Sequence, residues 1–345
     1  MSAVAATTAD DAADTALRAA RRDRLFDAMA GVGLDALVLG RRDSVAYATG
    51  LRSLWTAATR PFAAASVLVG AGRATHLLST WDEGVPPEVP FEHLYGITWS
   101  PAVMAASVGA IPGLVDVRRI GVEALSPGFE HMLRRLAPGA EVVPADDLLR
   151  AVRALKLPAE VERIRSAVAV AREAVEAAGA ALGGGLDPVA ARAAALRAAA
   201  ERGVTMPGSG VVVQPVGSGA EPVHVDVGLL VDGYEGGMGR TVSLGDAGDA
   251  GGPRDDAAVD AQRRLLDACR PGATGVDVRD AVAGVRADRW MVRGSGMGFE
   301  PPVVTDALGT ASVIDEAMVL SVEVELDGWR RRDLAVVGPT TTGAL

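Results

Sequence analysis

Runs of apolar residues separated by glycine and proline turns predict alternating strands and helices over the first 150 residues. Leu17, Leu25, Phe26 and Met29 recur at helical spacing, which predicts a helix over 17–30. Further helices are predicted over 102–111 and 128–136. Strands are predicted over 35–39, 44–50, 63–70, 74–79, 119–124 and 140–145. Strands that alternate with helices are typical of an α/β domain, which we expect to end near residue 150.

A different pattern follows this point. Pro158 breaks a helix, and a long amphipathic helix is predicted over 159–182. Further helices are predicted over 189–202, 255–269 and 276–285, and strands dominate after residue 210. We therefore predict two domains, 17–152 and 153–345, preceded by a disordered tail over 1–16.

Residues 223–241, VHVDVGLLVDGYEGGMGRT, predict a strand, an Asp-Gly turn and a second strand. Successive side chains on a strand point to opposite faces, so His224 and Asp226 share one face. An imidazole and a carboxylate side by side are candidate groups for proton transfer.

Composition narrows the possible functions. Lys and Arg number 34 and Asp and Glu 44, for a net charge of −10, which disfavours a nucleic-acid or anionic-membrane surface. The start of the chain has no signal-peptide pattern, and no apolar run approaches the ~20 residues of a membrane span. We expect a cytoplasmic protein. Cys269 is the one cysteine, so it forms no intrachain disulfide, and its place at a helix end favours a structural role.

Four segments together resemble the creatinase/prolidase/aminopeptidase P superfamily over nearly the whole chain. They are GLDALVLGRRDSVAYATGL (33–51), LRAVRALKLPAEVERIRSAVAVAREAV (149–175), ACRPGATGVDVRDAV (268–282) and AMVLSVEVEL (317–326), together with the hairpin described above. The resemblance implies a small α/β N-terminal domain followed by a pita-bread α/β domain, in which two similar halves surround one cleft. It also implies a homodimer.

Metal enzymes of this superfamily use two aspartates, one histidine and two glutamates, a set that suits two divalent ions. By resemblance, Asp226 is the first aspartate and Glu323 the first glutamate. Gly237 stands for the second aspartate, Ser295 for the histidine and Arg332 for the second glutamate. We therefore expect neither a metal nor another cofactor.

The residues that remain suggest a metal-free catalytic cluster of His224, Asp226 and Glu323. Arg332 is placed to pair with either carboxylate, and a histidine beside carboxylates is expected to have a raised pKa. His224 is then either the proton-carrying group or a structural residue bonded to a carboxylate.

Four residues are candidates for binding the substrate: Tyr234, Ser295, Glu300 and Arg332. Ser295 would donate a hydrogen bond, because no nucleophile-elbow motif surrounds it. Glu300 is either a third carboxylate of the site or a charge at its rim. Tyr234 keeps its position in the hairpin and also has a purely structural interpretation.

Three functions remain open. The first is a metal-independent enzyme that resembles creatinase, which cleaves a C–N bond with a histidine and carboxylates. It would act on a small polar amino- or guanidino-type molecule, by hydrolysis or by a lyase or cyclisation step in a specialised biosynthetic pathway. In this hypothesis Asp226 and Glu323 hold a cationic group and His224 moves a proton. The second is a catalytically silent protein that binds a ligand or partner, and the third is an Xaa-Pro-type metallopeptidase.

Overall fold

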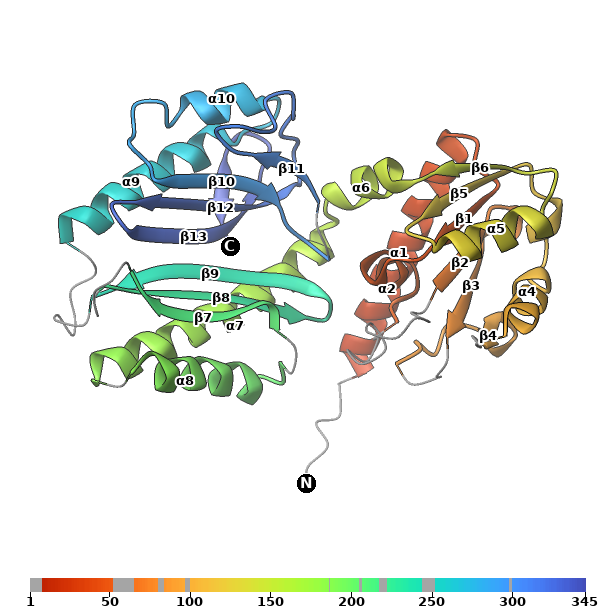
Figure 1. Cartoon of the computed structure of the whole chain (residues 1–345), viewed down its shortest axis with the longest axis horizontal. Coiled ribbons are helices and arrows are strands. Elements are labelled where there is room, and N and C mark those ends of the chain that lie inside the picture. The colour runs from red at the N-terminus through yellow and green to blue at the C-terminus, as the bar shows by residue number, and fades with distance from the viewer. Residues whose placement is uncertain are drawn as a thin grey trace. The chain divides into compact units, whose positions relative to one another are not determined.

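The computed structural model describes residues 8–51, 65–79, 84–96, 100–185, 187–204, 207–216, 222–243, 252–297 and 300–345. The chain divides into two compact units, Met1–Val152 and Arg153–Leu345. Each unit is built on its own sheet (Figure 1). Among the helices in the described ranges, none has the length and apolar character needed to cross a membrane.

The first unit contains a mixed six-stranded sheet in the order β4-β3-β2-β1-β5-β6. Its strands are β1 (Ala36–Leu39), β2 (Ala65–Val69), β3 (Ala74–Ser79), β4 (Leu94–Gly96), β5 (Arg119–Glu123) and β6 (Glu141–Pro144). Its helices are α1 (Thr8–Gly31), α2 (Arg42–Thr49), α4 (Pro101–Gly109) and α5 (Pro127–Leu136). Buried residues of β1, β2 and β5 form the core with Val108, Ile111 and Leu133.

Two predictions for this unit are wrong. Residues 8–16, predicted as a disordered tail, form the first turns of α1. Residues 44–50, predicted as a strand, belong to α2, which ends at Gly50 with a left-handed φ of 77° and an N–H bonded to the Ala46 carbonyl. A short apolar run fits either structure by periodicity, and the glycine C-cap decides for the helix here.

Helices α6 (Asp146–Ala154), α7 (Pro158–Gly183) and α8 (Pro188–Glu201) follow. Pro158 lies in the first turn of α7, where its missing N–H costs no helical hydrogen bond. The Asp187 side chain caps α8 by accepting the Ala190 N–H at 2.8 Å. The long helix predicted over 159–182 is thus confirmed almost to the residue.

The second unit is built on an eight-stranded sheet whose path runs β11-β10-β12-β13-β9-β8-β7, with β14 paired to β13. The strands are β7 (Pro207–Pro215), β8 (Val223–Val231), β9 (Tyr234–Val242), β10 (Arg289–Gly294), β11 (Glu300–Val304), β12 (Val319–Leu326), β13 (Trp329–Val337) and β14 (Thr342–Ala344). The predicted hairpin is β8 and β9. Its turn at Asp232 and Gly233 has φ of 50° and 86°, the geometry that Asp-Gly favours.

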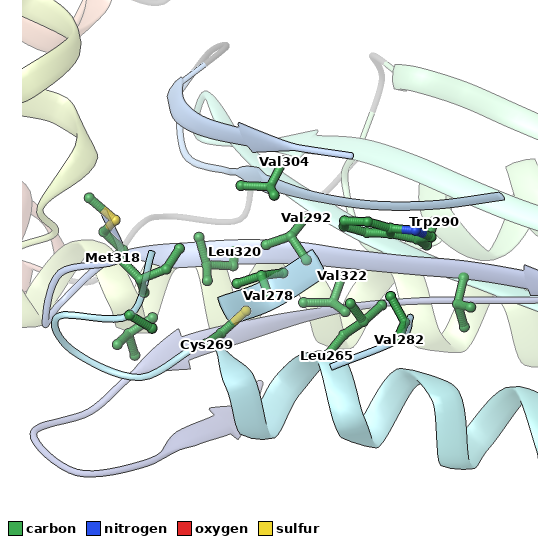
Figure 2. Packing of buried hydrophobic residues seen from close by; sticks show 14 of the residues in the cluster. Leu265, Cys269, Val278, Val282, Trp290, Val292, Val304, Met318, Leu320 and Val322 are labelled. Carbon is green, nitrogen blue, oxygen red and sulfur yellow. The ribbon is translucent and has the colours of Figure 1, made fainter. Parts of the chain in front are cut away.

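Two separate cores lie between this sheet and its helices. Helices α7 and α8 cover β7–β9, whereas α9 (Gly252–Ala268) and α10 (Gly275–Asp280) cover β10, β12 and β13 (Figure 1). Figure 2 shows Leu265, Cys269, Val322 and their neighbours packed in the second core. Cys269 is fully buried, and burial raises the pKa of its thiol to about 12, so it is an inert core residue.

Candidate functional site

The strands of the second unit divide their side chains between two faces. Val225 and Val227 of β8 and Val322 of β12 enter the two cores. Their neighbours in sequence therefore lie on the opposite side. We call that side the polar face; its chemistry-bearing residues are His224, Asp226, Glu235, Thr241, Arg289, Arg293, Ser321, Glu323, Glu325, Arg330 and Arg332.

Asp226 joins two guanidinium groups on this face. Its Oδ1 lies 2.7 Å from Arg332 Nη2, and its Oδ2 lies 3.3 Å from Arg330 Nη2. The same Arg330 nitrogen is 2.8 Å from Glu323 Oε1. Arg332 also donates to the Val227 carbonyl at 2.7 Å. We call Asp226, Glu323, Arg330 and Arg332 the two-guanidinium centre, since two cations share one bridging carboxylate.

Two glycines of β9 make room for this centre. A Cβ on Gly237 would lie 3.2 Å from Arg332 Cζ, and a Cβ on Gly239 would lie 2.8 Å from Asp226 Oδ2. Gly237 is the position at which the resemblance implies a second aspartate. The Arg332 guanidinium therefore borders the space that a side chain at 237 would need.

The five positions implied as metal ligands do not fit a pair of divalent ions. They provide two carboxylates, Asp226 and Glu323, both bound to guanidinium groups, and no imidazole. A cation at this place would be repelled by Arg330 and Arg332. In the described part of the chain, no three His, Cys, Asp or Glu side chains are grouped so that they could hold a metal ion.

Ser295 is fully buried and faces another carboxylate that the sequence did not single out. Its Oγ donates to Glu235 Oε2 at 3.0 Å, and Arg293 binds both oxygens of Glu235, with one contact at 2.9 Å. Burial raises the pKa of Glu235, but the hydrogen bonds and charge of Arg293, with Arg332 at 3.8 Å, outweigh burial and leave the pKa lowered. The Ser295 hydroxyl is thus engaged within the protein.

His224 lies beside the centre and is connected to it through Thr241. Its Nδ1 is 2.7 Å from Thr241 Oγ1, which also accepts a hydrogen bond from the backbone N–H of Arg330 at 2.8 Å. The carboxylate in ion-pair range of the ring is Glu325, with Oε1 3.9 Å from Nε2. The structure thus brings Asp226 and Glu323 together through Arg330 and places His224 next to them.

The pKa of His224 is lowered, contrary to the raised pKa predicted from its carboxylate neighbours. Burial is the largest cause; Glu325 and Asp226 raise the pKa, and Arg330 and Arg289 lower it. The imidazole is therefore neutral near pH 7. The prediction counted the nearby carboxylates and left out the burial of the ring, which has the largest effect, and the opposing arginines.

Two of the predicted substrate-binding residues are buried and engaged elsewhere. The Tyr234 hydroxyl donates to Glu160 Oε1 at 2.8 Å and the side chain is fully buried, so its structural interpretation holds. Glu300 is also buried and forms an ion pair with Lys156, with Arg153 Nε 3.7 Å away. Both side chains are thus bonded within the protein.

The sequence analysis missed Arg289, Arg293, Arg330, Glu235 and Glu325 as members of the polar face. A signal was present, because Glu323 and Glu325 alternate on β12 while Arg330 and Arg332 alternate on β13. The register places Glu323 opposite Arg332 and Glu325 opposite Arg330. Opposite charges at period two on adjacent strands predict cross-strand ion pairs.

Comparisons with known proteins agree with this architecture. A family model described as the creatinase/prolidase N-terminal domain matches residues 21–155, and one described as metallopeptidase family M24 matches residues 162–338. A search of curated proteins found no match.

Solved structures with a similar fold include three named peptidases. A prolidase from Pyrococcus horikoshii OT3 has 18% identity and a TM-score of 0.71, over 94% of this chain and 97% of that one. An Xaa-Pro dipeptidase from Bacillus anthracis has 16% identity and a TM-score of 0.72, over 95% and 97%. Dipeptidase PepE from Mycobacterium ulcerans has 23% identity and a TM-score of 0.67, over 96% of both chains. At these identities the likeness concerns the fold.

Proposed function

This chain belongs to metallopeptidase family M24, and from that premise we propose that it is a metal-independent member acting on a small polar molecule. The pita-bread fold implied by the sequence motifs is confirmed. The observation that carries the proposal is the Asp226 carboxylate, which binds Arg332 at 2.7 Å and Arg330 at 3.3 Å. In this proposal, the two fixed guanidinium groups supply the positive charge that metal ions supply in the metal-dependent members of the family.

We assign the proton-carrying role to His224. Its lowered pKa keeps the imidazole neutral near pH 7, which is the form that accepts a proton. Thr241 fixes the ring through Nδ1, and Glu325 at 3.9 Å from Nε2 would stabilise the imidazolium that forms. Hydrolysis of a C–N bond, and an elimination or cyclisation step, each need one proton accepted and one returned.

Asp226 and Glu323 serve this site as positioning residues. Both are bound to arginines of the chain itself, so the predicted role of holding a cationic group of the substrate is already filled. Their function in the proposal is to hold Arg330 and Arg332 in place. Glu323→Gln should therefore reduce turnover through a displaced Arg330 rather than through a lost proton carrier.

A catalytically silent ligand-binding protein is the second candidate. Ion pairing of both carboxylates of the centre favours it, because carboxylates held by arginines of the chain itself are not free to act as acid or base. An Xaa-Pro metallopeptidase is what the printed names of the structural neighbours suggest. The residues at the five implied metal-ligand positions, which include two carboxylates and no imidazole, argue against a metallopeptidase.

A screen by mass spectrometry distinguishes these candidates. Wild type and His224→Gln are incubated with pooled amino acids, amides and other small polar compounds, with EDTA or with Mn²⁺, and with Ala-Pro as the peptidase substrate. Turnover by wild type in EDTA that is lost in His224→Gln supports the proposal. Ala-Pro hydrolysis that requires Mn²⁺, with stoichiometric metal by elemental analysis, overturns it. Absence of any turnover by wild type also overturns it and assigns the silent role.

A further inference from the structure

The Thr241 hydroxyl lies between the His224 imidazole and the backbone of Arg330. The register of β8 and β9 places Thr241 directly opposite His224, and both residues are buried. Thr241 Oγ1 has three polar neighbours: His224 Nδ1 at 2.7 Å, the Arg330 backbone nitrogen at 2.8 Å and the Arg330 carbonyl oxygen at 3.5 Å. A hydroxyl donates one hydrogen and accepts up to two hydrogen bonds. The single hydrogen of the Thr241 hydroxyl therefore points either to the imidazole or to the carbonyl.

The backbone of Arg330 occupies one lone pair of the Thr241 oxygen. The register between β9 and β13 pairs Gly239 with Arg332 and Arg240 with Arg331. At the next position along β13, the Arg330 N–H donates to the Thr241 side chain. A backbone N–H can only donate, so Oγ1 is the acceptor in this bond. The bond holds the oxygen in place and leaves the direction of its own hydrogen to the other two contacts.

The lengths of these two contacts favour the imidazole as the acceptor. Hydrogen bonds donated by a hydroxyl are typically about 2.7–2.8 Å long, and those donated by an N–H are about 2.9–3.0 Å. The contact of 2.7 Å between Oγ1 and Nδ1 fits a hydroxyl donor. The distance of 3.5 Å to the Arg330 carbonyl is long for any hydrogen bond. Nδ1 therefore accepts the hydroxyl hydrogen and carries none of its own while the ring is neutral.

The second ring nitrogen of His224 has surroundings that agree with this direction. A neutral imidazole carries one hydrogen, which is on Nε2 when Nδ1 is an acceptor. Nε2 faces Glu325, whose Oε1 lies 3.9 Å away. An N–H directed toward a carboxylate is favourable, whereas a nitrogen lone pair in the same place would be repelled. Thr241 and Glu325 thus favour the same tautomer from the two nitrogens of the ring.

We propose that Thr241 is a positioning residue that holds neutral His224 with its hydrogen on Nε2, so that protons enter and leave the ring at Nδ1 through the Thr241 hydroxyl. The tautomer depends on the hydrogen bonds alone, whereas the proton path rests on the proposed function. In that path a proton of the substrate passes to Thr241 Oγ1 while the hydroxyl's own hydrogen passes to Nδ1. The substrate keeps the electron pair of the broken bond, and the ring becomes an imidazolium between Thr241 and Glu325. The reverse transfers return one proton, and Thr241 forms no covalent bond to the substrate.

Nitrogen NMR of protein labelled with ¹⁵N-histidine tests the tautomer at pH 8, and His224→Gln assigns the two ring resonances. In wild type we expect Nε2 to resonate as an N–H nitrogen and Nδ1 downfield, as a nitrogen without hydrogen. Thr241→Val keeps the shape of the side chain and removes the donor, so the Nδ1 resonance should move further downfield. Thr241→Ser should keep the wild-type position. The control is Thr75→Val on β3, where the buried Oγ1 has no hydrogen-bond partner among the described residues, and it should leave His224 unchanged.

A hydrogen on Nδ1 in wild type overturns the proposal, and so does an Nδ1 resonance that does not change in Thr241→Val. For a compound turned over in the screen above, Thr241→Val should lower kcat on the order of a hundredfold with little change in KM, and Thr241→Ser should retain most of kcat. Turnover that is lost in His224→Gln but kept in Thr241→Val overturns the proton path and leaves the proposed function intact. A protein without turnover loses the path together with the proposed function, and the NMR result still decides the tautomer.

Discussion

Glu235 and Glu300 of the second unit, the first partly buried and the second fully buried, have pKa values shifted in opposite directions. Glu235 accepts hydrogen bonds from Nη1 and Nη2 of Arg293 and from the Ser295 hydroxyl, and its pKa is lowered. Glu300 is held by Lys156, and its pKa is raised because burial outweighs the charge of Lys156 and Arg153. Burial alone therefore does not determine the charge of a carboxylate in this fold.

The two glutamates differ in burial and also in the cation that each receives. Arg293 presents a planar fork that satisfies both oxygens of Glu235. Lys156 divides its ammonium among Glu300 and the backbone carbonyls of Arg153, at 2.6 Å, and Ala154, at 3.1 Å. Arg293 thus keeps the pKa of Glu235 lowered on the polar face, whereas Glu300 and Lys156 form a buried ion pair, which we call the anchor, between the segment before α7 and β11.

The largest expected effect comes from breaking the anchor. Lys156→Met leaves Glu300 buried without its ammonium partner, and we expect the free energy of unfolding to fall by about 3–5 kcal/mol. Urea denaturation at pH 7 measures this change. The double variant Lys156→Met with Glu300→Gln should recover most of the loss, since no buried charge is left unpaired. A loss below about 1 kcal/mol in the single variant would contradict the assignment of a buried ion pair.

The next test removes arginines from the polar face. Arg332→Met leaves Asp226 with Arg330 alone, so we expect a smaller loss of about 2–3 kcal/mol. In the double variant Arg330→Met with Arg332→Met, Asp226 has lost both guanidinium partners and Glu323 keeps only Arg289 among the described residues, and added Mn²⁺ should raise the melting temperature. Wild type should show no such rise. A Mn²⁺ response equal in the two proteins would show that the arginines do not substitute for a cation.

The sequence predicted those parts of the molecule that depend on periodicity and order of motifs. Strand parity placed Asp226 and His224 on one face, and the segment order gave the pita-bread fold. The cross-strand arginines Arg289, Arg293 and Arg330 lie outside the five positions implied as metal ligands, so the resemblance did not single them out. The direction of the His224 pKa shift depends on burial and on four charged side chains from four strands, which no local pattern contains.

The burial of Glu300 and Tyr234 was equally beyond local pattern. Each was a candidate for binding the substrate, and each is bonded to a partner far along the chain, Glu300 to Lys156 and Tyr234 to Glu160. Residues 8–16 show the same limit. Their polar composition suggested disorder, and yet they continue the first helix.

A matched pair of serines tests how the hydroxyl contributes to the charged state of Glu235. Ser295→Ala removes a hydrogen bond to a buried carboxylate, and we expect a loss of about 1.5 kcal/mol. Ser321 is the control, because its buried Oγ has no hydrogen-bond partner among the described residues, and Ser321→Ala should change stability by less than about 0.5 kcal/mol. Thermal unfolding at pH 7 measures the loss of stability in both variants. Equal losses would show that the Ser295 hydroxyl does not stabilise Glu235.

The smallest expected effect is a change in the titration midpoint of His224, a third buried titratable group. Its folded-state pKa is lowered below the ordinary value of about 6.5, so its contribution to stability is complete above that pH and is lost as pH falls through the folded-state pKa. Titration of the imidazole Cε1 proton by NMR should place its midpoint below 6.5. Glu325→Gln removes a carboxylate and should lower the midpoint further, whereas Arg289→Gln removes a cation and should raise it, only slightly because Arg289 is exposed and screened. Shifts of the same sign in the two variants would mean that burial alone, and not the balance of charges on the polar face, sets the protonation of His224.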